Sequence, residues 1–157
     1  MKKFTVRMQV HEMGLDMYLN AKRFLWHTED ELADRVGEVF PELGSARVKE
    51  ITAEVMYWRK SNAIHKWFVD NVQDGADECQ ESWVERKHLE ALLAVIDEVL
   101  VERSKALLLL PPASGFFFGS KDVDEWYWED LVQTKERLED ILSKEWTGWD
   151  FYYRASW

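Results

Sequence analysis

The side chains best suited to bind a ligand lie where an alternating segment ends and a helical segment begins. Trp58, Arg59 and Lys60 come first, and Asn62 and His65 follow three residues apart. Backbone N–H groups at a helix start are partly positive, and cationic side chains just before them favour an anion such as a phosphate. An indole stacks on flat rings, and residues three apart share a helical face. The pattern predicts a site for a small anionic molecule at these five residues.

A purely structural interpretation of the same residues stays open. The two cations would pair with some of the thirty acidic residues of the chain, as surface cations commonly do. Trp58 would then fill the core, and His65 would be a hydrogen-bonded partner of the sheet.

Two further segments supply rings that would wall the same ligand. Phe117 is the central one of three phenylalanines flanked by glycines, and its alternative role is to plug the core. Trp126, Tyr127 and Trp128 are consecutive, and one helical face cannot bury all three. At least one of the two tryptophans is therefore expected at the surface or in an interface. We add Phe117 and Trp128 to the predicted ligand site, and the exposed tryptophan predicts a homo-oligomer.

Hydrophobic patterning indicates the elements that must position these side chains. Alternating segments predict strands at residues 15–24, 48–59, 82–84 and 149–157, with a further strand or buried loop at 116–119. Apolar residues every three to four positions predict helices at 29–40, 62–72, 86–103 and 124–144, the first after a capping box that starts at Thr28.

The alternating strands favour a sheet with one wetter face over a fully covered parallel sheet. We therefore expect an α+β fold, with a mixed or mainly antiparallel sheet of about four strands packed by about four helices. Residues 1–12 are interpreted as an N-terminal extension and residues 13–157 as a single α+β domain.

Composition narrows the range of partners. The net charge of −10 argues against a broad nucleic-acid-binding surface, which needs clustered Lys and Arg. Apolar runs are too short for a transmembrane helix, so no membrane partner is expected. Cys79 is the single cysteine, which excludes an intramolecular disulfide and fits a reducing compartment.

Sequence motifs for catalysis, metals and cofactors are missing. The chain has no Gly-x-Ser-x-Gly, no His-Glu-x-x-His, no P-loop and no dinucleotide fingerprint. The acidic segment 73–80 lacks the spacing of a calcium-binding loop, and its carboxylates disfavour ionisation of Cys79. We accordingly expect no metal, no cofactor and no catalytic residue that a motif identifies.

Several stretches carry a resemblance. These are Met-Gly-Leu-Asp-Met-Tyr-Leu at 13–19, Tyr-Trp-Arg-Lys-Ser-Asn-Ala-Ile-His-Lys-Trp-Phe-Val at 57–69, and the segments 115–120, 127–131 and 149–153. Together they resemble a family of small uncharacterised proteins encoded by bacteriophages and prophages, over residues 13–157. The resemblance implies a phage gene product located in the bacterial host cytoplasm, and it supplies no activity or site residues.

Three functions are compatible with the sequence. The preferred hypothesis is a phage-encoded, non-enzymatic protein that captures a small anionic, nucleotide-like molecule to counter a host defence signal. The second is an acidic inhibitor that binds a host protein through complementary charge and exposed aromatic residues. The third is an enzyme acting on a nucleotide-like substrate, with His65 as acid or base beside Asp16 or Asp77.

Overall fold

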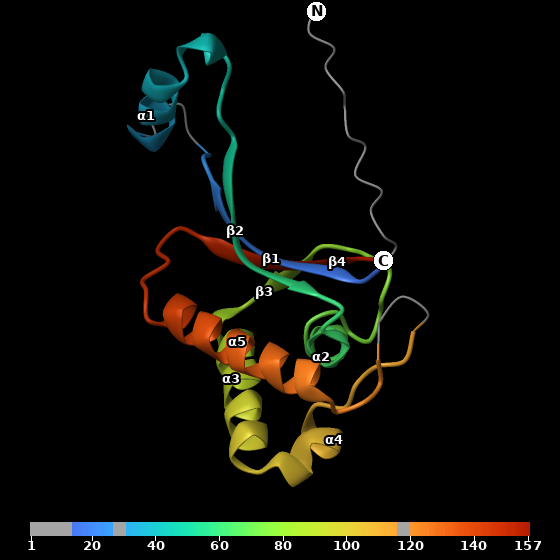
Figure 1. Ribbon diagram of the computed structural model, residues 1–157. Coiled ribbons are helices and arrows are strands. Elements are labelled where there is room, and N and C mark those ends of the chain that lie inside the picture. Colours follow the sequence, from blue (N-terminus) through green and yellow to red (C-terminus); the bar gives the residue numbers. More distant parts are fainter. Residues whose placement is uncertain (1–13, 27–30, 116–119) are drawn as a thin grey trace, which may run out of the picture.

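The computed structural model describes residues 14–26, 31–115 and 120–157 (Figure 1). Its four strands are β1 (Asp16–Phe24), β2 (Glu50–Arg59), β3 (Ser82–Val84) and β4 (Asp150–Ser156). They form one antiparallel sheet in the order β2-β1-β4-β3. The five α-helices of this part of the chain are α1 (Glu31–Val39), α2 (Asn62–Asn71), α3 (Arg86–Val101), α4 (Ala106–Leu109) and α5 (Glu125–Leu142). The predicted α+β fold with a mainly antiparallel sheet is thus confirmed.

The central strand β1 follows the predicted alternation. Leu15, Met17 and Leu19 are fully buried, while Tyr18 and Asn20, each of which follows one of them, are only partly buried. This apolar face of the sheet is covered by α2, α3 and α5, which lie together on one side of it (Figure 1). One face is therefore packed and the other wetter, as period-two patterning requires.

Strand β2 departs from regular alternation because it contains a bulge. Leu19 pairs with Met56 and the next residue of β1 pairs with Glu54, so Val55 has no partner in β1. Val55 and Met56 are consequently both buried, although consecutive residues of a regular strand lie on opposite faces of the sheet. The Arg137 side chain of α5 donates from Nε to the Val55 carbonyl oxygen at 2.6 Å. The bulge thus fixes where α5 lies against the outer strand.

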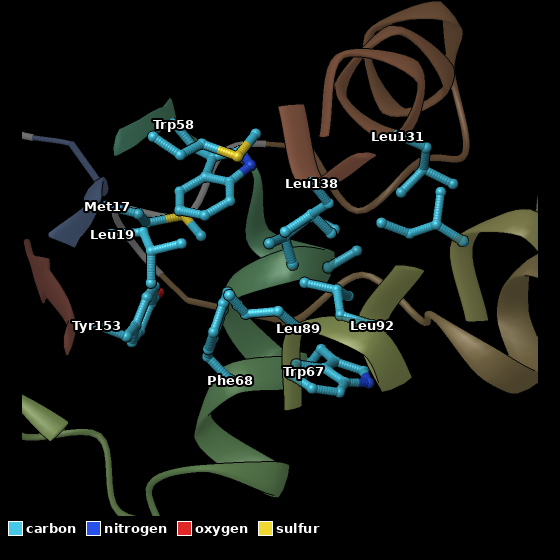
Figure 2. Packing of buried hydrophobic residues seen from close by; sticks show 14 of the residues in the cluster. Met17, Leu19, Trp58, Trp67, Phe68, Leu89, Leu92, Leu131, Leu138 and Tyr153 are labelled. Carbon is cyan, nitrogen blue, oxygen red and sulfur yellow. The ribbon is translucent and has the colours of Figure 1, made fainter. Parts of the chain in front are cut away.

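The helical layer is apolar along the predicted stripes. Leu89, Leu92, Ile96 and Val99 of α3 are fully buried, and Leu131 and Leu138 of α5 pack with them. Figure 2 shows Phe68 and Trp67 of α2 beside Leu89 and Leu92, with Tyr153 of β4 on the opposite side of Phe68. Burial of rings and branched chains in one contiguous cluster supplies the main stabilisation of the fold.

The β1–β2 hairpin extends beyond the body and carries α1 and the short 3-10 helix Pro41–Leu43 (Figure 1). The predicted helix after Thr28 is confirmed from residue 31 onward, whereas Thr28 itself lies outside the described residues. No residue of α1 is buried, and Val39 and Phe40 are 70% and 50% exposed. The apolar stripe of this helix is therefore not buried against the rest of the described chain.

Three sequence expectations need comment. Residues 103–109 are not a plain loop but a 3-10 turn (Arg103–Lys105) followed by α4. The predicted extension 1–12 and the expected strand or loop at 116–119 both lie outside the described residues. Within the described residues, α5 and the other helices are too short or too polar to cross a bilayer.

Candidate functional site

A cavity of about 370 Å³ opens where β2 meets α2, opposite the first half of α5. Its lining comes from three separate segments: Arg59, Lys60, Ser61, Asn62 and Ala63; Ser120, Asp122 and Asp124; and Trp126, Tyr127, Asp130 and Leu131. The volume lies in the range of sites for drug-sized ligands. Three of the predicted site residues, Arg59, Lys60 and Asn62, therefore do share one cavity.

The cationic side of the cavity is set by the turn between β2 and α2. Lys60 has a φ of 58°, a left-handed conformation that is unusual for a residue with a side chain. The surrounding hydrogen bonds hold it there: its N–H donates to the Leu15 carbonyl at 2.7 Å, and its carbonyl accepts from Asn62 N at 2.9 Å. Arg59 and Lys60 are both exposed, so the turn presents two cationic side chains at the cavity rim.

Buried polar groups connect the segments behind the rim. The Asn62 amide nitrogen donates to the Ser120 carbonyl oxygen at 2.7 Å, which ties α2 to the segment before α5. Ser61 is 3% exposed, and its hydroxyl hydrogen-bonds the carboxylate of Asp130. These two bonds hold the floor of the cavity in place before any ligand arrives.

Asp130 has an unusual acidity. Burial raises its pKa to about 6, and the nearby carboxylates of Glu129 and Asp124 add to the rise, while the Ser61 hydrogen bond opposes it. A group that titrates near neutrality inside a cavity is typical of functional sites.

The N-terminus of α5 completes the wall. The Asp124 carboxylate caps the helix by accepting from Tyr127 N at 3.1 Å. The Tyr127 hydroxyl donates to the Leu110 carbonyl at 2.9 Å, and burial raises its pKa to about 12. With Tyr127 anchored inward, the preceding Trp126 is left 75% exposed at the cavity edge. The prediction that one of the paired tryptophans is exposed is confirmed.

The cavity has two kinds of charge. Arg59 and Lys60 share the cavity lining with three carboxylates, those of Asp122, Asp124 and Asp130. The sequence pattern indicated only the cationic half.

Trp126 and Asp130, the two lining residues with the clearest binding chemistry, were both missed as site residues. Their spacing of four on one helix was the signal that could have placed them on a shared face.

Trp58 does not line the cavity. It is 5% exposed, and its indole Nε1 donates to the Thr134 hydroxyl at 2.9 Å. Its ring meets Phe68 edge-on at a centroid distance of 5.9 Å. A ring enclosed in this way fills the core beneath the site and is not open to stacking on a ligand, as the structural alternative for Trp58 predicted.

His65 is fully buried away from the cavity lining. Its Nδ1 lies 2.8 Å from the Tyr153 hydroxyl, and its Nε2 lies 3.0 Å from the Asp77 carboxylate. Burial raises the pKa of Tyr153 well above its usual value, so the phenol keeps its proton and can donate to Nδ1. In that tautomer of His65, Nε2–H donates to Asp77. His65 therefore joins α2 to β4, the structural role that was its alternative.

Trp128, another of the predicted site residues, does not line this cavity. Trp128 faces a different hollow, where the Arg103 guanidinium lies 4.5 Å from its ring centre. Phe117 lies outside the described residues. No group of three or more described His, Cys, Asp or Glu residues is arranged to hold a metal ion.

Comparison of the chain with protein family models, with curated proteins and with solved structures finds no match to any of them.

Proposed function

We propose that this protein is a non-enzymatic binding protein that captures a small anionic, nucleotide-like molecule in the cavity between β2, α2 and α5. One observation carries the proposal: segments about seventy residues apart bring two cations, an exposed indole and a partly buried carboxylate to the same cavity. Each of these matches one part of a nucleotide, and an isolated cationic turn would match only one.

The chemistry assigns a part of the ligand to each side chain. A phosphate or similar anion lies against Arg59 and Lys60, where charge-assisted hydrogen bonds are strong. A flat ring stacks on Trp126, as bases do on exposed aromatic side chains. N–H groups of that ring donate to the Asp130 carboxylate, which needs a donor because it is partly buried. The resemblance to phage proteins supports the further proposal that the ligand is a host defence signal.

The first experiment exposes the purified protein to an extract of phage-infected cells, releases bound molecules by heat and identifies them by mass spectrometry. Recovery of an intact anionic compound, enriched over an unrelated acidic protein, supports capture. Conversion of the compound into new products would instead indicate that the protein is an enzyme, with Asp130 as the acid or base. Recovery of no compound would refute the binding proposal.

A matched pair of variants then locates the site. Trp126 and Trp26 are both 75% exposed, but only Trp126 lines the cavity. Trp126→Ala should weaken binding of the identified compound, measured by calorimetry, whereas Trp26→Ala should not. Equal affinities of the unmodified protein, Trp126→Ala and Trp26→Ala would show that the compound does not bind in this cavity.

One observation favours a second function. The arm formed by the hairpin end, α1 and the 3-10 helix exposes Val39 and Phe40, and Trp26, just after β1, is exposed as well. Adjacent exposed apolar residues such as Val39 and Phe40 are typical of protein interaction surfaces. An acidic protein with such an arm would bind a partner with a basic, apolar surface, as an inhibitor of a host protein does. A pull-down from host extract with the intact protein and with a Phe40→Asp variant tests this alternative.

A further inference from the structure

A second hollow, of about 420 Å³, shares no lining residue with the proposed ligand site. It is lined by residues of β3, of the first turn of α3 and of the connection that leads from α5 to β4. Four aromatic residues contribute to its wall: Trp83, Trp146, Trp149 and Phe151. Such a concentration of rings at one hollow needs an explanation beyond core packing, since Trp83 is 55% exposed.

The rings on the α5 side are held in fixed orientations. The Trp146 indole Nε1 donates to the Ile141 carbonyl at 2.8 Å, at the C-terminal end of α5. Its ring meets Trp149 at 6.0 Å with planes 82° apart, and meets Phe151 at 5.2 Å with planes 70° apart. Nearly perpendicular rings present faces in more than one direction, and their positions are set without a ligand.

The charges at the hollow are mainly negative. Three carboxylates, those of Glu85, Glu145 and Asp150, line it together with one guanidinium. That guanidinium belongs to Arg86, which donates to Glu90 at 2.9 Å and to the Leu142 carbonyl at 2.5 Å. Its charge is thereby directed toward Glu90 and the C-terminus of α5, where a cation is favourable.

The two carboxylates on the α5 side are available to a ligand. Glu85 pairs with Lys87 at 2.6 Å and caps α3, so it is already engaged. Among the described residues, neither Glu145 nor Asp150 takes part in a salt bridge or accepts a side-chain hydrogen bond. A positively charged ligand would therefore meet two carboxylates beside the aromatic wall.

We infer that this hollow binds an alkylated ammonium group, either as a free quaternary ammonium compound or as a methylated amine on a side chain. The faces of indole rings attract cations, and indole is the strongest of the aromatic side chains in this respect. Methylated ammonium ions are weakly hydrated and lose little on leaving water, whereas their methyl groups contact the rings. The carboxylates supply the net attraction that brings the cation to the rings.

The direct test titrates tetramethylammonium chloride into protein labelled with ¹⁵N at the indole nitrogens. The Trp83 and Trp149 signals, assigned from single variants, should shift and saturate, while the Trp126 signal stays in place. Sodium chloride at the same ionic strength should not reproduce the shifts. Shifts that do not saturate, or that equal those in sodium chloride, would overturn the inference.

Two variants separate recognition from stability. Trp83→Ala should weaken tetramethylammonium binding by roughly fivefold or more, from the size of cation–π contacts. Asp150→Asn keeps all rings and should also weaken binding, and Trp126→Ala should leave it unchanged. Unchanged affinity in both Trp83→Ala and Asp150→Asn, with folded protein shown by circular dichroism, would refute the assignment.

The source of the cation is then resolved with two probes, choline and a short peptide that contains trimethyllysine. Tighter binding of the peptide identifies a modified side chain as the ligand, and tighter binding of choline identifies a free compound. Either result supports the shared chemistry. Failure of both probes and of tetramethylammonium to bind would refute it, and it would leave the nucleotide-like site untouched.

Discussion

The substitution Asp130→Asn should stabilise the protein, although it removes a side chain from the proposed ligand site. Burial raises the pKa of Asp130 from 3.8 to about 6, so the folded state disfavours the carboxylate that exists at neutral pH. Asparagine is uncharged and nearly the same size. Its amide oxygen can still accept the hydrogen bond from Ser61.

The magnitude follows from the shift in acidity. A pKa of about 6 in place of 3.8 corresponds to about 3 kcal/mol for a fully desolvated group. Asp130 is only partly buried, so solvent screening reduces the expected gain at pH 7 to about 1–2 kcal/mol. For a chain of this length, that gain raises the melting temperature by roughly 2–8 °C.

The sign of the pH dependence is equally specific. Because the folded pKa is raised, the folded state binds more protons than the unfolded state between pH 3.8 and about 6. The destabilising contribution of Asp130 is therefore absent below pH 3.8, grows as the pH rises through this window, and is complete above about pH 6. The gain in free energy of unfolding that Asp130→Asn produces should depend on pH in the same way.

Urea unfolding of both proteins between pH 4 and pH 8 measures this advantage. The exposed neighbour Asp122, which lines the same cavity, provides the control variant Asp122→Asn, expected to change stability by less than about 0.5 kcal/mol. We expect that burying the Asp130 carboxylate destabilises the folded state. A lower free energy of unfolding for Asp130→Asn at pH 7, or a gain in that free energy that does not change with pH, would refute this expectation.

Three further predictions concern other parts of the molecule. Trp126→Ala should weaken binding of a nucleotide-like ligand by about tenfold in calorimetry, the usual loss when a stacking ring is removed, while Trp26→Ala retains full affinity. Thr134→Val should cost about 1–3 kcal/mol in urea unfolding because it leaves the buried Trp58 N–H without an acceptor; a neutral result would contradict that bond. Phe40→Asp should abolish self-association in sedimentation measurements if the arm joins two copies, and an unchanged mass would exclude the arm from any oligomer.

Local patterning predicted the elements well. The buried face of β1 and the apolar stripe of α3 followed directly from spacing, because a strand repeats every two residues and a helix every 3.6. The bulge at Val55 could not be predicted in the same way. It depends on how β2 pairs with β1 and on the contact with Arg137, both of which involve residues distant in the sequence.

The candidate site was predicted in part. Arg59, Lys60 and Asn62 are close in sequence and remain together in the cavity. Trp58 and His65 come from the same stretch, yet both lie in the core, because Trp58 packs beneath α5 and His65 joins α2 to β4. Residue type alone does not distinguish these outcomes, because an indole and an imidazole suit both a ligand site and a satisfied interior.

The sequence by itself determined the fold class, the strand and helix positions, the acidic character of the chain and the cationic turn before α2. These properties depend on neighbouring residues and on composition. Only the tertiary structure decided that Trp126 and Asp130 lie opposite that turn, and that the tryptophans around Trp83 and Trp149 gather beside carboxylates. Such groupings arise when α5 and β4 pack against the rest of the chain. The contacts that bring them together span many tens of residues, which no local pattern records.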